Sequence, residues 1–266
     1  MPLTDEQLRS YRDQGFVIVE HFFDDREIKG MLVELERLKQ ARAGRNLARK
    51  QGENDNGAGA MNLQIAPLST VSPLFQTLPF EPRVIEVVTQ CIGQPFVRQL
   101  DQIFAKPGGH GVGTPWHQDN GYFNISDATK ALSMWTALHD ATRANGTLEV
   151  VPRSHLMRLP HDPIAGSEHG TIQCHVDESL AVPVEVKAGG VIFFNYGIAH
   201  RTGPNRTDWE RAGLAFHFLR NDAILADKDP NIYVHVTGPT ATNGVREYGR
   251  PVAGRWSNEI DKLLNT

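Results

Sequence analysis

The pattern of apolar and polar residues changes near residue 93, and the two sides of this point predict different structures. Before it, the chain carries helix signals. Thr4 precedes DEQLRSYRDQ (5–14), and an aspartate at 24 or 25 precedes REIKGMLVELERLKQAR (26–42). Such residues cap helix starts, especially when acidic side chains follow in the first turn. We therefore predict two helices, separated by a strand in GFVIVEHFF (15–23).

Two further features support helices in this part of the chain. Leu32, Leu35 and Leu38 give the second segment an apolar stripe at helical spacing. PRVIEVVTQCIG (82–93) begins with proline and ends with glycine, which is the usual asymmetry of helix ends. A third helix is therefore predicted there.

After residue 93 the chain consists of short apolar runs separated by turn sequences. The turns are KPGGHG, RANG, KAGG and GPNRTD. Many short strands joined in this way predict a β-sandwich or a barrel. We expect one domain over 1–266, with a helical part at about 1–93, a barrel core at about 94–220 and an irregular tail over 221–266. The predicted strands lie in FVRQLDQIFAK, ALSMWTALHD, GTLEVVP, AVPVEVK, VIFFNYG and RAGLAFHFLR.

The segment 42–60 has no apolar period and is rich in glycine, asparagine and charge. It is either a lid over a site or a solvated surface loop. Its basic residues either meet an anionic substrate or are simply hydrated. These residues are Arg42, Arg45, Arg49 and Lys50.

Composition narrows the class of protein. The chain has 266 residues, 40% of them hydrophobic, and a net charge of −4, so we expect no general binding of nucleic acid. It contains no apolar run of about 18 residues, so no membrane span is expected. Cys91 and Cys174 match no zinc spacing and no disulfide framework, which favours a reducing cytoplasm.

TPWHQDNGYF (114–123) contains a histidine and an aspartate two positions apart, His117 and Asp119. On a strand these side chains would project from one face and provide two of the three ligands of a facial iron site. They could equally be polar residues near a turn. His175 and Asp177 repeat the spacing, so the spacing alone is weak support for a metal.

The downstream sequence provides what a metal site would still need. An apolar strand in KAGGVIFFNYGIAHRTGPNRT leads to His200 before a glycine-proline turn, and Arg211 follows eleven residues later. Arg211 shares one side of its predicted strand with Gly213, Ala215 and His217, which leaves space in front of the guanidinium. Arg211 is either a surface ion-pair residue or a clamp for a carboxylate.

Three segments together resemble the phytanoyl-CoA dioxygenase family of iron(II)- and 2-oxoglutarate-dependent oxygenases. They are TPWHQDNGYF, MWTALHDATRANGTLEVVPRSH and IAHRTGPNRTDWERAGLAFHF, and the resemblance extends from Thr4 to about Leu219. It implies a mainly β fold with flanking helices: a double-stranded β-helix, which is a jelly-roll or cupin-like barrel, with the N-terminal helices packed outside.

The resemblance also implies roles for particular residues. The metal ligands and catalytic residues would be His117, Asp119 and His200, and Arg211 would bind the far carboxylate of 2-oxoglutarate. The other residues of the cosubstrate pocket would be Thr202, Trp135 and Gln102, with Asn62 at a further position. Arg153 stands where the family usually has glycine, so it either alters the local turn or places a cation near the pocket mouth. His155 is expected to be structural, and His175 and Asp177 are expected not to be ligands.

The expected cofactors are iron(II), 2-oxoglutarate and dioxygen, and the expected partner is a small organic substrate. Three ligands on one face leave positions for the keto acid and oxygen. The expected reaction oxidises a C–H bond, most simply by hydroxylation, and releases succinate and carbon dioxide. Asp119 disfavours halogenation, because the related halogenases lack this carboxylate. Two alternatives remain: a metal-dependent hydrolase on the same barrel, and a non-catalytic ligand-binding jelly roll.

Overall fold

The computed structural model describes residues 2–48, 61–165 and 171–265. Arg49, Lys50 and most of the predicted lid at 42–60 lie outside these residues. Within them, the three predicted helices are confirmed as α1 (Asp5–Gln14), α2 (Asp25–Gln40) and α4 (Pro82–Ile92). Thr4 caps α1 and Asp24 caps α2, each through a capping box with the residue three positions on. Gly93 ends α4 at a positive φ of 79°, which explains why glycine stands there.

Two antiparallel sheets form the body of the protein, and the predicted mainly β fold with flanking helices is confirmed. The larger sheet has the order β1-β11-β6-β13-β4-β3-β2, with β14 also paired to β4, and the smaller has the order β10-β7-β12-β5. The larger sheet comprises β1 (Phe16–Val19), β2 (Arg45–Asn46), β3 (Leu63–Ile65), β4 (Phe96–Lys106), β6 (Ala131–Ala137), β11 (Val191–Asn195), β13 (Arg211–Arg220) and β14 (Val234–His235). The smaller sheet comprises β5 (Thr114–His117), β7 (Leu148–Val151), β10 (Val182–Val184) and β12 (Ala199–Thr202).

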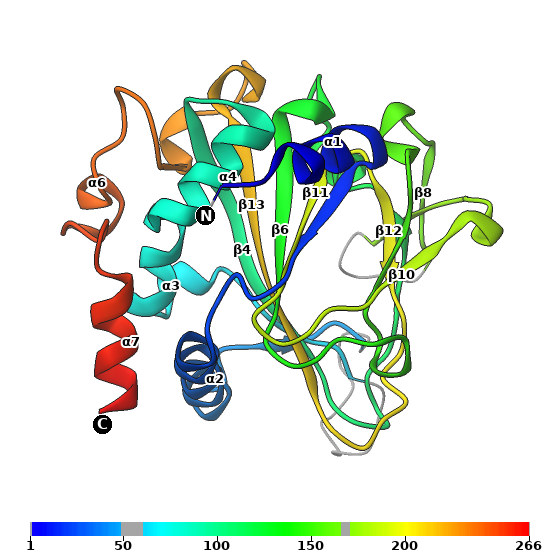
Figure 1. The fold of residues 1–266 in the computed structure, drawn as a ribbon, viewed down its shortest axis with the longest axis horizontal. Helices are drawn as coiled ribbons and strands as arrows, with labels where there is room; N and C mark the ends of the chain where they lie inside the picture. Colours follow the sequence, from blue (N-terminus) through cyan, green and yellow to red (C-terminus); the bar gives the residue numbers. More distant parts are fainter. Residues whose placement is uncertain (1, 49–60, 166–170, 266) are drawn as a thin grey trace.

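The helices cover the outer face of the larger sheet, as Figure 1 shows for α2, α3 (Pro73–Thr77), α4 and α7 (Trp256–Leu264). Strand β13 shows how sequence alternation produces this arrangement. Its residues Leu214, Phe216 and Phe218 are buried in the main core, against apolar side chains of the helices. The alternate residues face the opposite side, where a cavity lies between the two sheets.

Two details of the chain path differ from the sequence-based expectation. The strand before His200 was predicted to run on to that residue. Instead β11 ends at Asn195, the chain crosses from the larger sheet to the smaller, and His200 lies on β12. Only three residues separate the two strands, and Ile198 and Ala199 continue the apolar run up to His200, so periodicity could not reveal the crossing.

The tail was expected to be irregular but contains β14, α6 (Val245–Tyr248) and α7. Helix α7 packs against α2, with Ile260 fully buried in the main core, and the Trp256 indole N–H donates to Glu27. Because tertiary packing stabilises these short elements, local sequence signals for them are weak. A short hairpin of β8 (His161–Pro163) and β9 (Ile172–Cys174) was also not predicted.

The stability of the larger sheet should depend on Asp101 of β4. This fully buried carboxylate accepts hydrogen bonds from the backbone N–H groups of Leu68 and Ser69 and lies 3.3 Å from Nη1 of Arg98. The substitution Asp101→Ala leaves these three donor groups without their acceptor. It should lower the free energy of unfolding by about 3–5 kcal/mol. Denaturant unfolding followed by circular dichroism measures this.

The control is Asp222→Ala, which removes a half-exposed carboxylate paired with Arg220. It should cost less than about 1 kcal/mol, because exposed ion pairs contribute little. Equal losses in the two variants would contradict the role given to Asp101.

Candidate metal centre

Two histidines lie opposite each other on neighbouring strands of the smaller sheet. His200 of β12 pairs in register with His117 of β5, and the centroids of the two rings are 4.2 Å apart. The Nδ1 atom of His117 lies 2.9 Å from the carbonyl oxygen of Pro115, and that of His200 lies 3.1 Å from the carbonyl oxygen of Ile198. A carbonyl only accepts, so each Nδ1 carries the proton and each Nε2 keeps a free lone pair. Both imidazoles are thus prepared to bind a metal.

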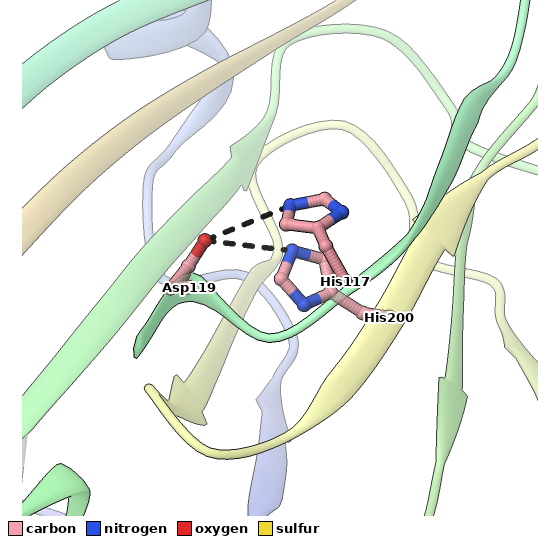
Figure 2. A group of neighbouring side chains, drawn as sticks. All are labelled: His117, Asp119 and His200. Carbon is pink, nitrogen blue, oxygen red and sulfur yellow. Dashed lines mark ion pairs between the residues drawn. The ribbon is translucent and has the colours of Figure 1, made fainter. Parts of the chain in front are cut away.

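Asp119 completes the group, but not by the predicted strand geometry. Strand β5 ends at His117, and Asp119 is the first residue of a short helix, α5 (Asp119–Phe123). One carboxylate oxygen lies 3.7 Å from Nε2 of His117 and 3.8 Å from Nε2 of His200 (Figure 2). The three ligand atoms lie within 4.8 Å of one another, so they can hold one metal ion. Two imidazoles and one carboxylate are the donor set of a facial iron triad.

Gln118, between His117 on β5 and Asp119 on α5, fixes the turn that brings Asp119 inward. Its side-chain amide donates to the carbonyl oxygens of Met157 and Gly197, and its side-chain oxygen accepts from the N–H of Leu159. Gly197 lies just before β12. One buried amide therefore ties the segment carrying His117 and Asp119 to the segment carrying His200.

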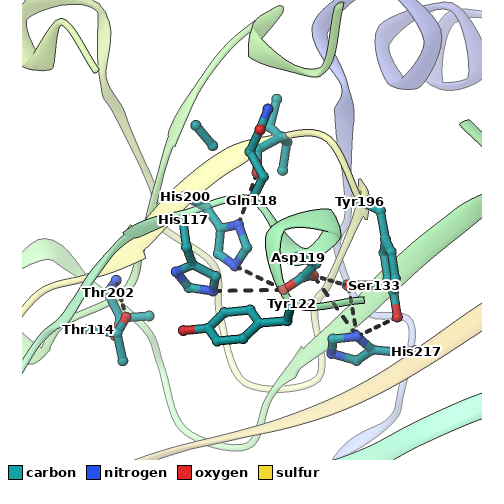
Figure 3. Close-up of polar contacts among 12 residues, drawn as sticks. Thr114, His117, Gln118, Asp119, Tyr122, Ser133, Tyr196, His200, Thr202 and His217 are labelled. Atoms are coloured by element: carbon teal, nitrogen blue, oxygen red, sulfur yellow. Dashed lines mark hydrogen bonds and ion pairs between the residues drawn. The ribbon is translucent and has the colours of Figure 1, made fainter. Parts of the chain in front are cut away.

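The second carboxylate oxygen of Asp119 contacts residues of the larger sheet. The hydroxyl of Ser133 on β6 donates to it, and Nδ1 of His217 lies 4.0 Å away (Figure 3). His217 Nδ1 also lies 2.8 Å from the hydroxyl of Tyr196. Burial alone would raise the pKa of Asp119, but the neighbouring histidines and the Ser133 hydroxyl lower the pKa below its usual value. The carboxylate is therefore ionised.

Burial, followed by the proximity of His200, lowers the pKa of His117 to about 4. The ring is therefore neutral at physiological pH and can act as a metal ligand. The neutral ring of His117 and the ionised carboxylate of Asp119 thus have the protonation states that a divalent metal requires.

The cavity between the sheets has a volume of about 410 Å³, and the three candidate ligands line it. Arg211 lies in the same cavity and is only 1% exposed. One of its terminal nitrogens donates to the carbonyl oxygen of Gly146, while its Nε has no partner. Burial lowers the pKa of Arg211 to about 10, so the guanidinium is charged at neutral pH. Within the part of the chain that the structure describes, no carboxylate pairs with it.

The other residues expected around a cosubstrate also line this cavity. Gly213 leaves room for the ring of Trp135, because a Cβ at Gly213 would lie 2.3 Å from that ring. Asn62 is buried and its side-chain oxygen has no partner. The predicted set Thr202, Trp135, Gln102 and Asn62 is therefore brought to one place. Arg45 lines the cavity as well.

Residues expected to lie outside the site do so. His175 is 80% exposed in its side chain and pairs with Asp162 rather than joining the three candidate ligands. His155 contacts the carbonyl oxygen of Arg12 through Nε2. Arg153 adopts a positive φ of 67°, which explains the usual glycine, and it does not line the cavity. The turn is thus kept, and a cation at the pocket mouth is not supplied by Arg153.

Four residues with polar contacts in the site were not singled out from sequence. They are Lys106, Thr114, Ser133 and Tyr196. Ser133 did carry a weak signal, because it is one of two polar residues in the otherwise apolar β6, whereas Lys106 is one of several polar residues in β4 and did not stand out. The contacts of these residues could not be predicted from the sequence.

Residues 11–213 match the model of the phytanoyl-CoA dioxygenase family. The chain belongs to this family, and the predicted enzyme class, a non-haem iron(II)- and 2-oxoglutarate-dependent dioxygenase, is confirmed.

Individual relatives agree with the family. The chain is 28% identical over 230 residues to the ectoine dioxygenase of Bordetella parapertussis, covering 80% of this chain and 74% of that protein. It is 28% identical to a probable phytanoyl-CoA dioxygenase of Caenorhabditis elegans, covering 90% and 80%. Among solved structures, the epimerase SnoN in complex with Fe3+, alpha ketoglutarate and nogalamycin RO is 26% identical, with a TM-score of 0.66 and coverage of 81% and 83%.

Helices long and apolar enough to cross a membrane do not occur among the described residues. Cys91 and Cys174 are free thiols. The predicted cellular compartment stays a prediction.

Metal affinity should depend on the hydroxyl behind Asp119. Ser133→Ala leaves one carboxylate oxygen without its donor, so Asp119 can turn away from the two imidazoles. The affinity for iron(II) should fall by about 10- to 100-fold. Anaerobic titration calorimetry with iron(II), repeated with manganese(II), measures the change.

Thr136→Val is the matched control. Thr136 lies on the same strand, is fully buried, and its hydroxyl has no partner. The affinity of the Thr136→Val variant for iron(II) should stay at the wild-type value. Wild-type affinity in Ser133→Ala would show that the hydroxyl does not orient the carboxylate.

Proposed function

We propose that this protein uses iron(II), 2-oxoglutarate and dioxygen to hydroxylate an unactivated C–H bond of a small organic molecule. The observation that carries the proposal is a single cavity with two complementary parts. One part is the donor set of His117, Asp119 and His200, and the other is the buried guanidinium of Arg211, which has no acidic partner among the described residues. The first suits a divalent metal and the second suits a carboxylate.

The proposed roles follow from the contacts of each group. His117, Asp119 and His200 hold the metal on one side, which leaves the other side for the keto acid and dioxygen. When bound, iron and 2-oxoglutarate supply the oxidising chemistry, with succinate and carbon dioxide as products.

Arg211 binds the far carboxylate of 2-oxoglutarate through charge-assisted hydrogen bonds, which are strong in a site this buried. Thr202, Trp135 and Gln102 form the walls around it, and the unpaired side-chain oxygen of Asn62 offers one more polar contact. These residues orient the cosubstrate and exclude water from it.

The cavity limits the class of substrate. Its volume of about 410 Å³ also has to contain the cosubstrate, so the remaining space suits a small molecule or one end of a larger one. Leu100, Phe104, Tyr122 and Phe123 make much of the wall apolar. Arg45 lines the same cavity and offers a cation to an anionic substrate group.

Each alternative function leaves one part of the cavity unexplained. A metal-dependent hydrolase needs the triad and a water molecule but gives the buried guanidinium no partner. A non-catalytic binding protein needs a cavity but no set of three metal ligands. An oxygenase that takes a 2-oxo dicarboxylic acid uses both features.

The first test uses the wild-type protein without oxygen. Adding iron(II) and then 2-oxoglutarate should produce a visible charge-transfer absorption band, because the keto acid chelates the metal. Omitting either component is the control. A complete absence of the band in folded, metal-loaded protein would sink the proposed function.

Admitting oxygen then tests the reaction with a panel of small organic compounds. Succinate release should depend on one class of compound, and its product should gain one oxygen atom by mass. Loss of two hydrogens, or an unchanged mass, would instead identify desaturation or isomerisation and refute hydroxylation.

The second test isolates Arg211. Arg211→Met keeps most of the side-chain volume but removes the charge, so the dissociation constant for 2-oxoglutarate should rise by about 100-fold while iron(II) affinity is unchanged. Arg220→Met is the control at the other end of β13, where the arginine pairs with Asp222. Equal cosubstrate affinity in the two variants would remove Arg211 from the proposed site.

A further inference from the structure

The cavity contains a second buried cation that the proposed mechanism does not use. Lys106, at the end of β4, is 1% exposed and stands opposite Arg211 of β13 in the strand register. Its Nζ donates to the hydroxyl oxygen of Thr202 at 2.6 Å and to the carbonyl oxygen of Gly203 at 2.7 Å. Both acceptors are neutral, and no acidic partner of Lys106 occurs among the residues described.

A buried lysine usually pairs with an acid, since desolvation penalises its charge. Here burial and then the charge of Arg211 lower the pKa of Lys106 well below its usual value. Two cations on neighbouring strands repel each other, and a carboxylate between them would reverse that repulsion. The pair therefore marks a place for an anion that the described part of the chain does not provide.

Three hydrogen bonds meet at the Thr202 side of the cavity. The hydroxyl oxygen of Thr114 accepts the backbone N–H of Thr202 at 2.9 Å, and the two threonine hydroxyls lie 2.8 Å apart (Figure 3). Either hydroxyl can donate across this contact, and a ligand carboxylate in the cavity would select the arrangement in which Thr114 donates to Thr202. In that arrangement the Thr202 oxygen accepts from both Lys106 and Thr114.

A hydroxyl has two acceptor lone pairs and one proton. When Thr114 donates, both lone pairs of Thr202 are engaged and its proton is free to point into the cavity that Thr202 lines. An ammonium group also has three N–H donors, of which Lys106 uses two within the protein. Both groups thus keep one donor for a ligand.

We propose that Lys106 is a positioning residue for the far carboxylate of 2-oxoglutarate: it holds the Thr202 hydroxyl as a donor to that carboxylate and adds a second positive charge beside Arg211. This inference rests on the proposed function. Its consequence is selectivity, because Lys106 stabilises 2-oxo acids that carry a second carboxylate and has no effect on those that lack one.

The test compares two keto acids on iron(II)-loaded protein without oxygen. 2-Oxoglutarate carries the far carboxylate, and 2-oxovalerate has the same chain length without it. Both chelate iron, so the charge-transfer band reports each dissociation constant. Lys106→Met should raise the constant for 2-oxoglutarate by about 10- to 100-fold and change that for 2-oxovalerate by less than about threefold.

Lys187→Met is the matched control, because Lys187 is exposed and pairs with Asp140. It should bind both acids as the wild type does. Equal weakening of both acids in Lys106→Met would mean a general structural defect and would overturn the inference, as would unchanged binding of 2-oxoglutarate.

A double-mutant cycle tests whether Lys106 acts through Thr202. Thr202→Val removes the hydroxyl, and combining it with Lys106→Met should weaken 2-oxoglutarate binding by less than the product of the two single effects. If the two single effects on the dissociation constant multiply fully in the double variant, Lys106 does not act through Thr202. If Lys106→Met does not fold, Thr114→Val serves instead: it removes the second donor to Thr202 and should weaken 2-oxoglutarate alone.

Different results would contradict the proposed function and the role of Lys106. If wild-type protein gives no band with 2-oxoglutarate, the proposed function falls. If the wild type binds it and Lys106→Met binds it equally well, only the inference about Lys106 falls.

Discussion

The pairing of β12 with β5 is the constraint on which the site depends. It sets His200 directly opposite His117, and each ring is oriented by a carbonyl oxygen two residues earlier in the chain. A slip by one residue would turn one imidazole to the other face of the sheet. Gln118 secures this register from the side, because its amide bonds to the segment just before β12. The metal centre is therefore a consequence of backbone pairing more than of side-chain choice.

Charge is separated along the cavity. Asp119 provides the negative end, fixed by Ser133 and flanked by histidines, whereas Arg211 and Lys106 provide a positive end that no acid of residues 2–48, 61–165 or 171–265 pairs with. Buried charges without partners are costly, so such an arrangement persists where a ligand completes it. A metal at one end and a dicarboxylic keto acid reaching to the other would balance both ends. The electrostatics of the cavity and the family of the chain thus agree.

The larger sheet provides the rigid wall that this arrangement needs. Strand β13 has the helix-covered core on one face, through Leu214 and Phe216, and the cavity on the other, through Arg211 and His217. Gly213 lets the ring of Trp135 approach the strand closely. Residues held between a packed core and a cavity lose little further freedom when a ligand binds, and this preorganisation favours tight and oriented binding.

Sequence alone determined the helices at 5–14, 25–40 and 82–92 and the long strands, because periodicity and caps are local signals. The residues around the cavity were predicted from the resemblance of three segments to a known family, because spacing alone was weak support. The sequence did not determine that Asp119 leaves the strand for a helix, that the chain changes sheets before His200, or that the tail folds onto α2. It also missed the contacts of Lys106 and Ser133. These features depend on partners distant in the chain, and only the packing of the two sheets brings those partners together.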